Sequence, residues 1–211
     1  MQTEKITERI VSWLKDYAQK ANVKGYIIGV SGGVDSGVVS TLCAMTGLKV
    51  IAVEMPIRQK ADQVNRALEH IQFLENKFPN VEGKSVDLNE PFEALYKTFD
   101  VKDDEFPAEK LAFANTRARL RMLTLYYYGQ INGLLVCGTG NKVEDFGIGF
   151  YTKYGDGGVD VSPIADLYKT EVYALARSLD LPESIKNAIP TDGLWDVDRT
   201  DEQQIGATYP E

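Results

Sequence analysis

Residues 29–36 (GVSGGVDS) are the part of the chain best suited to hold a phosphate group. They follow the apolar run 26–28 and precede an apolar helical pattern that begins at Val34. A glycine turn between a strand and a helix lets the backbone approach a ligand closely, and it directs several N–H groups and the helix N-terminus toward one point. The order of strand, glycine turn and helix therefore predicts an anion-binding cradle.

Three side chains make this cradle more specific than an ordinary Gly-Gly turn, which is the alternative reading of the two glycines alone. Ser31 and Ser36 add hydroxyl donors, and Asp35 adds a carboxylate. A carboxylate does not itself favour an anion, so its presence is reasonable if it holds a divalent cation that the phosphates share. No Gly-Lys-Ser/Thr closes the loop, so it is not a Walker A loop.

The full string Ser-Gly-Gly-x-Asp-Ser resembles the pyrophosphate-binding loop of the ATP pyrophosphatases, which adenylylate a substrate and release pyrophosphate. Four further blocks are NTRARLR at 115–121, GTGNKVE at 138–144, YTKYGDGGVD at 151–160 and PIADLYKT at 163–170. Together with the glycine loop, their order and spacing closely resemble ammonia-dependent NAD synthetase. The resemblance extends from about residue 3 to 209, and the Lys-Tyr-Gly-Asp-Gly block is its most specific part.

This resemblance implies a two-step reaction. The nicotinate carboxylate of deamido-NAD attacks the α-phosphorus of ATP, with Mg²⁺ bound, and gives an acyl-adenylate and pyrophosphate. Ammonia then displaces AMP and leaves the amide of NAD. Activation is needed because a carboxylate repels a nucleophile and oxide is a poor leaving group.

The resemblance also implies roles for individual residues. It places ATP contacts at Gly29, Val30, Ser31, Gly32, Gly33, Val34, Asp35, Ser36, Thr139, Lys169 and Thr191, deamido-NAD contacts at Arg119, Lys153 and Asp160, magnesium ligands at Asp35 and Glu144, and catalytic roles at Lys169 and Asp156. The alternatives are a solvated loop acid for Glu144 and turn-stabilising hydroxyls for the two threonines. The spacing from Glu144 to Asp156 is one residue longer than in many relatives, and Arg199 replaces the family's usual Gln.

Three arginines follow one another at alternate positions of an expected helix. Arg117 and Arg121 share a face of that helix, whereas Arg119 points away from them. The resemblance implies that Arg119 faces substrate, which leaves the face of Arg117 and Arg121 for structure or partner contacts. An ordinary solvated face is the alternative.

Apolar periodicity predicts a doubly wound, mostly parallel α/β sheet of Rossmann-like type with helices on both faces. We expect strands at 26–30, 50–55, 81–88 and 134–138, and helices at 3–21, 34–46, 61–77, 91–99, 108–129 and 168–180. The segment 147–160 is expected to be a loop with site residues, and 192–211 a polar end without a closing helix. We expect a single domain over 1–211 that lacks the family's C-terminal tail.

Composition excludes several classes of protein. The net charge of −8 makes broad nucleic-acid contact unfavourable, and no apolar segment has the length of a membrane span or the form of a signal peptide. Cys43 and Cys137 are too few for a disulfide framework, so we expect buried, reduced thiols in a cytoplasmic protein. The single histidine, His70, lies in a polar helical stretch and is not expected to be catalytic.

Two other functions remain open at this point. One is another ATP pyrophosphatase amidotransferase, such as a GMP synthetase-type domain, although no residues are left to build a glutaminase or dimerisation domain. The other is a non-catalytic ATP-binding paralogue. The resemblance further implies a homodimer whose active site lies near the shared interface, with small molecules as its only other partners.

Overall fold

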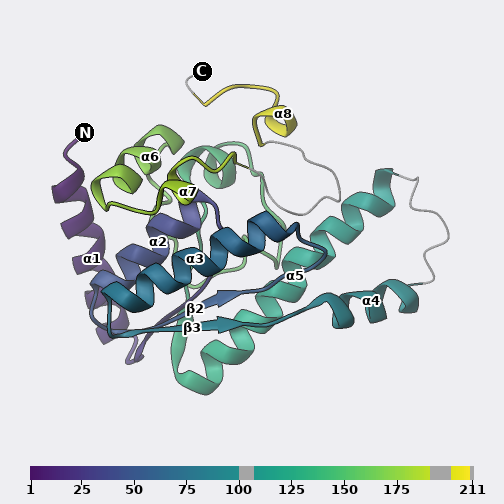
Figure 1. The fold of residues 1–211 in the computed structure, drawn as a ribbon, viewed down its shortest axis with the longest axis horizontal. Helices are drawn as coiled ribbons and strands as arrows, with labels where there is room; N and C mark the ends of the chain where they lie inside the picture. Colours follow the sequence, from purple (N-terminus) through teal and green to yellow (C-terminus); the bar gives the residue numbers. More distant parts are fainter. Residues whose placement is uncertain (100–106, 191–200, 210–211) are drawn as a thin grey trace.

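A computed structural model describes residues 1–99, 107–190 and 201–209. Its centre is a four-stranded parallel sheet with the strand order β3-β2-β1-β4 (Figure 1). The strands are β1 Gly25–Gly29, β2 Lys49–Glu54, β3 Val81–Ser85 and β4 Leu134–Val136. The expected parallel α/β fold is confirmed, and β3 ends three residues earlier than predicted.

Helices occupy most of the remaining described chain. They are α1 Thr3–Lys20, α2 Val34–Met45, α3 Ala61–Lys77, α4 Asn89–Thr98, α5 Pro107–Asn132, the π-helix η1 Lys142–Gly147, α6 Lys169–Ser178, α7 Glu183–Lys186 and α8 Asp201–Ile205. The expectation of no helix after residue 192 was wrong, because α8 forms there. Among the described residues, no helix is both long and apolar enough to cross a membrane.

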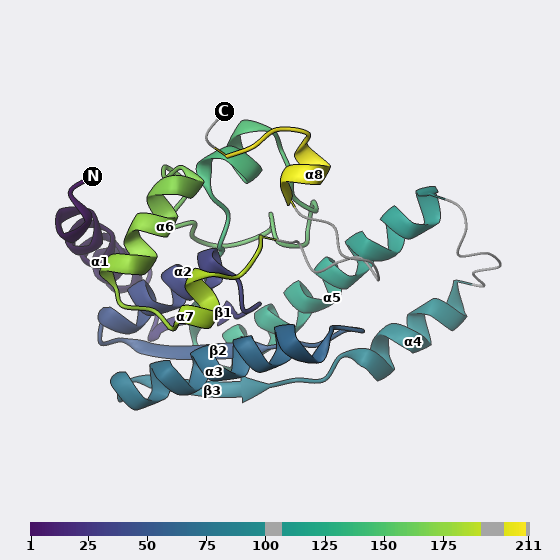
Figure 2. The same cartoon turned by 45° about the horizontal axis from the view of Figure 1, so that its top comes forward.

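Alternate side chains of β1 pack against helices on opposite faces of the sheet. Tyr26 and Ile28 belong to an apolar cluster with residues of α1, α2 and α6, whereas Ile27 packs with residues of α5. Successive residues of a strand point to opposite faces, so a strand covered on both sides is apolar throughout. Figure 2 shows α6 and α7 beside α2, away from α5.

The strand order reverses next to β1. From β1 the chain adds β2 and β3 on one side, and it then crosses to place β4 on the other side of β1. In open α/β sheets, ligands bind at such a point, outside the carboxyl ends of the strands. The segments after β1 and after β4 lie there, and they include the glycine cradle and the block 138–144.

Both cysteines are buried free thiols, as expected. Their Sγ atoms lie 3.5 Å apart, and burial raises the pKa of the Cys137 thiol.

His70 is fully buried, although the stretch of chain around it is polar. Helical spacing places it with Ala67, Ile71 and Leu74 on the inner face of α3. Its Nε2 lies 2.9 Å from Ser40 Oγ. Burial lowers the pKa of His70 to about 4, so the folded protein holds a neutral imidazole.

We expect His70 to make the protein less stable in mild acid. Its pKa in the unfolded chain is about 6.5, so as the pH falls from 6.5 to about 4 the unfolded state gains a proton that the folded state does not. The free energy of unfolding should fall by about 3 kcal/mol over this range through this group. Urea unfolding between pH 7 and pH 4 measures the effect. If the free energy of unfolding of His70→Gln fell as much as that of the wild type, the prediction would be contradicted.

Candidate active site

The glycine cradle is braced by its own two serines. Ser36 Oγ accepts the Ser31 N–H at 3.2 Å and donates to the Gly33 carbonyl at 3.0 Å, and it lies 3.0 Å from Ser31 Oγ. Ser31 Oγ accepts the Gly33 N–H at 3.2 Å. These bonds hold the turn against the start of α2, whose N-cap is Gly33. The backbone N–H groups and the positive end of the helix dipole are thereby presented at one place.

Gly32 is the position of the cradle that requires glycine. Its φ is +82°, and a Cβ there would lie 3.0 Å from the Gln63 carbonyl oxygen and 3.1 Å from the Ala67 nitrogen. A side chain would therefore push the cradle away from the start of α3. Gly47 offers a matched control, because its φ is +73° and a Cβ there would meet no atom within 4 Å.

We expect Gly32→Ala to weaken ATP binding and Gly47→Ala to leave it unchanged. Both variants carry the cost of a left-handed alanine, about 1–2 kcal/mol of stability. Only Gly32→Ala also displaces the cradle, and losing about 1.4 kcal/mol of contact energy there weakens binding tenfold. Calorimetric titration with ATP and Mg²⁺ measures this difference, and equal ATP affinities in the two variants would contradict it.

Lys169 joins two acidic residues beside the cradle. Its Nζ lies 2.5 Å from Asp35 Oδ2 and 3.0 Å from Glu144 Oε1, and the lysine side chain is 2% exposed. Burial opposes the charge of Lys169, but the two carboxylates outweigh it and raise the pKa of the lysine. Burial also opposes the charge of Asp35 and so raises the pKa of this carboxyl group, and the Lys169 ammonium offsets part of that rise. The two carboxylates thus converge on a position that holds a cation.

Asn141 connects the Asp35 carboxylate to the backbone at the start of η1 and is completely buried. Its Oδ1 accepts the N–H groups of Val143 and Glu144, both at 3.1 Å, and caps η1. Its Nδ2 lies 3.4 Å from Asp35 Oδ1. Glu144 itself lies within this π-helix, Lys142–Gly147.

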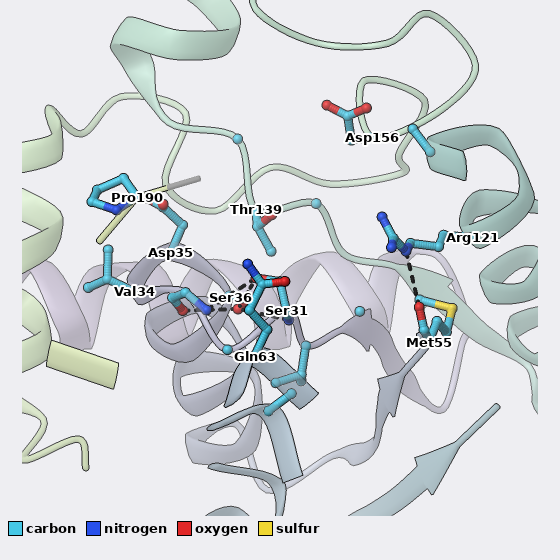
Figure 3. A pocket seen from close by; sticks show the side chains of 18 of the residues that line it. Ser31, Val34, Asp35, Ser36, Met55, Gln63, Arg121, Thr139, Asp156 and Pro190 are labelled. Carbon is cyan, nitrogen blue, oxygen red and sulfur yellow. Dashed lines mark hydrogen bonds between the residues drawn. The ribbon is translucent and has the colours of Figure 1, made fainter. Parts of the chain in front are cut away.

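The glycine cradle, Glu144 and Lys169 line a cavity of about 270 Å³ at the carboxyl ends of β1 and β4. In Figure 3, Ser31 and Ser36 lie together at the centre, with Arg121 and Met55 on one side and Asp156 above. The residues proposed from the sequence that line the cavity are Gly29, Val30, Ser31, Gly32, Gly33, Val34, Asp35, Ser36, Thr139, Glu144, Asp156 and Lys169. One concave site therefore brings together segments more than 100 residues apart.

Three residues proposed as deamido-NAD contacts do not line this cavity. Arg119 and Lys153 lie next to each other, with Arg119 Nε donating to the Lys153 carbonyl at 3.1 Å. Asp160 accepts a hydrogen bond from the Tyr126 hydroxyl at 3.1 Å and from the Val136 N–H at 2.8 Å. The latter bond ties Asp160 to β4, a structural role that the sequence did not indicate. Thr191 and Arg199 lie outside the described residues.

Arg117 and Arg121 share an inward face of α5, as helical spacing predicts, but Arg121 lines the cavity and Arg119 does not. Arg117 is buried with its guanidinium 5.1 Å from the Phe92 ring centre. Arg121 donates to the Met55 carbonyl at 3.1 Å and to Gln59 Oε1 at 2.8 Å, at the wall of the cavity. Sequence reasoning assigned Arg121 no ligand contact, although its shared face with Arg117 was a signal that it points inward.

Asp145 and Tyr209 are two further residues near the site that sequence reasoning missed. Burial and the charges of neighbouring carboxylates, Asp156 and Glu144 foremost, raise the pKa of Asp145 to about 7. Tyr209 donates its hydroxyl to Glu144 Oε1 at 2.6 Å, and its ring centre lies 5.2 Å from Lys169 Nζ. Nothing in the local sequence around Tyr209 signals a partner 65 residues away.

The donor set suits a hard divalent cation that is also bound by a ligand. Carboxylate oxygens are the ligands that Mg²⁺ prefers, and Mg²⁺ is held by one or two carboxylates together with substrate phosphates. Asp35 and Glu144 supply those two, next to an anion-binding cradle. Within the described part of the chain no cluster of three or more metal-binding side chains occurs, so a complete cage of protein ligands is not present there.

A parallel sheet with an anion cradle at its switch point and paired carboxylates beside it defines a nucleotide-binding α/β protein. The sequence profile described as NAD synthase matches residues 6–211. The chain belongs to the NAD synthase family.

Similar proteins extend over nearly the whole chain. The NH(3)-dependent NAD(+) synthetase of Carboxydothermus hydrogenoformans is 42% identical over 207 residues, which are 98% of this chain and 82% of that protein. A solved structure of NMN synthetase from Francisella tularensis has a TM-score of 0.89 and 33% identity, and the match covers 100% of this chain and 84% of that one. The NH3-dependent NAD synthetase of Campylobacter jejuni has a TM-score of 0.77 and 32% identity, covering 88% and 77%.

Proposed function

We propose that the protein uses ATP and ammonia to amidate the nicotinate carboxylate of deamido-NAD, giving NAD, AMP and pyrophosphate. One observation carries the proposal: in a chain of this family, Lys169 lies between Asp35 and Glu144 at the edge of a glycine cradle. This is a site for a polyphosphate and a cation at the carboxyl end of a parallel sheet.

In this proposal each group of the cavity has a defined task. The N–H groups of the cradle bind the β- and γ-phosphates that leave as pyrophosphate. Asp35 and Glu144 hold Mg²⁺, which when bound neutralises charge on the phosphates. Lys169 stabilises the charge that develops as the substrate carboxylate attacks the α-phosphorus. Ammonia then adds to the acyl carbon, and AMP leaves with the oxygen that joined it to the substrate.

We propose that deamido-NAD binds beside this cavity. Lys153 and Asp160 belong to the loop 148–160, Arg119 donates to the Lys153 carbonyl, and Asp156 of the same loop lines the cavity. Thr139 lines the same cavity and offers a hydroxyl to ATP. A contact between Thr191 and ATP remains a prediction.

The nitrogen donor in this proposal is free ammonia. A glutaminase needs a nucleophile and a base in contact, most often cysteine with histidine. The chain has two cysteines and one histidine, all buried, and the cysteines contact each other while His70 contacts Ser40. No cysteine–histidine pair is therefore available within the chain.

Incubation with ATP, Mg²⁺, deamido-NAD and ammonium tests the proposal. AMP and NAD appearing in equal amounts would support it. ATP binding without either product would instead indicate a non-catalytic paralogue. AMP formed only with xanthosine monophosphate would indicate a GMP synthetase-type enzyme.

Nicotinate mononucleotide is a second candidate substrate, because the NMN synthetase structure matches the full length of this chain with a TM-score of 0.89. Both substrates present the same nicotinate carboxylate, so the cradle and Lys169 would act alike on either. Measurement of kcat/KM for nicotinate mononucleotide and for deamido-NAD under the same conditions decides between the two substrates. A preference for the mononucleotide would reassign the substrate and leave the chemistry unchanged.

We also propose that the protein forms a homodimer through α5. Leu123, Tyr127 and Ile131 follow one another at intervals of four residues on one face of this helix, and they are 67%, 60% and 62% exposed. An exposed apolar stripe of this kind is typical of an interface. Light scattering after size-exclusion chromatography measures the oligomeric state, and a fully active monomer would contradict the proposal. A cytoplasmic location remains a prediction.

A further inference from the structure

A protein cation fills the position between the two proposed metal ligands. Lys169 Nζ contacts Asp35 Oδ2 at 2.5 Å and Glu144 Oε1 at 3.0 Å. Tyr209 donates to the same Glu144 oxygen at 2.6 Å. The Lys169 side chain is 2% exposed, so it cannot leave the carboxylates without a new partner inside the protein.

Charge and geometry make two cations incompatible at this position. The two buried carboxylates need compensating positive charge, and separating a buried ion pair leaves an uncompensated charge in a poorly hydrated place. A divalent ion bound by Asp35 and Glu144 would repel an ammonium held within contact distance of both. Lys169 must therefore move when a metal binds, and a ligand must receive it.

ATP supplies that ligand, because its phosphates bring several negative charges to the cradle next to Lys169. We propose that Lys169 occupies the metal position in the nucleotide-free protein and that Mg²⁺ enters only together with ATP, whose phosphates draw the ammonium away from Asp35 and Glu144. This inference rests on the proposed function's assignment of Asp35 and Glu144 as magnesium ligands. By occupying the metal position, Lys169 prevents free Mg²⁺ from binding before ATP is present.

Binding of Mn²⁺, a spectroscopic substitute for Mg²⁺, tests the proposal in the absence of nucleotide. Electron paramagnetic resonance should detect no stoichiometric site in the wild-type protein. Lys169→Met, which removes the charge and keeps the length, should gain one site with at least tenfold tighter binding. Lys169→Arg, which keeps the charge, should resemble the wild type. The double variant Lys169→Met/Asp35→Asn should lose the gained site. This loss would show that the Mn²⁺ binds at Asp35 and not at carboxylates on the acidic surface.

Folding of each variant is checked by circular dichroism, and Lys169→Gln replaces Lys169→Met if the latter does not fold. Melting provides a second readout: Mn²⁺ should raise the Tm of the uncharged variant and leave that of the wild type unchanged.

The proposal is overturned if the nucleotide-free wild type binds one Mn²⁺ that Glu144→Gln abolishes. It is also overturned if a folded, uncharged Lys169 variant gains no site. The amidation assay of the wild type is independent of both results, so NAD formation combined with either of them would leave the proposed function intact.

Discussion

Lys169→Ala is expected to lower kcat for amidation by about 10²–10³-fold, the usual effect of losing one preorganised group that stabilises transition-state charge. Lys169 is the buried cation beside the cradle, so its removal leaves the charge that develops at the α-phosphoryl group without a partner. Because Lys169 also contacts the phosphates of bound ATP in this proposal, KM for ATP should rise as well, and kcat/KM should fall further than kcat. Steady-state production of AMP and NAD measures both.

Two controls separate this effect from a loss of folding. Removing one member of a buried ion pair costs about 3–5 kcal/mol of stability, so assays are run well below the Tm of the variant. Lys20→Ala changes an exposed lysine at the end of α1 and should leave kcat unchanged. A folded Lys169→Ala variant with a near-normal rate would contradict the assigned role.

Asp35→Asn is expected to lower kcat/KM by at least about 100-fold, because metal binding contributes several kcal/mol to stabilising transition-state charge. The amide keeps the shape of the side chain, but it lacks the charge that holds a divalent cation. The Mg²⁺ concentration for half-maximal rate should therefore rise in parallel. Initial rates over a series of Mg²⁺ concentrations at saturating ATP measure both changes.

Asp16→Asn provides the matched control, since Asp16 is exposed on α1 and does not line the cavity. It should leave the rate and the Mg²⁺ dependence at wild-type values. An Asp35→Asn enzyme with an unchanged Mg²⁺ requirement would remove Asp35 from the metal site.

Local patterns were sufficient to predict the sheet and the cradle. The strands around Ile27 and Ile51 are apolar throughout because both faces are covered, and such runs are visible in the sequence. The cradle combines a strand, a glycine turn and a helix in one short segment, so no tertiary contact is needed to recognise it. The sequence analysis assigned Asp35, Glu144 and Lys169 to one site because of the order of the family motifs. The residues around each of them would not have indicated their contact with one another.

Long-range packing decided the features that the sequence did not reveal. His70 has polar neighbours in the chain, but its position on the inner face of α3 places it against Ser40. Asp160 is tied to the Val136 N–H by the return of the chain to β4. The contact of Tyr209 with Glu144 likewise depends on where α8 and the residues after it pack, which no periodicity records.

Isotope transfer tests most directly whether the substrate carboxylate attacks the α-phosphorus of ATP bound at the cradle. Deamido-NAD carrying ¹⁸O in both oxygens of its nicotinate carboxylate is incubated with the protein, ATP, Mg²⁺ and ammonium, and the products are analysed by mass spectrometry. The mechanism predicts one ¹⁸O in the phosphate of AMP and one in the amide of NAD. Unlabelled AMP, or ADP accompanied by labelled inorganic phosphate, would contradict it.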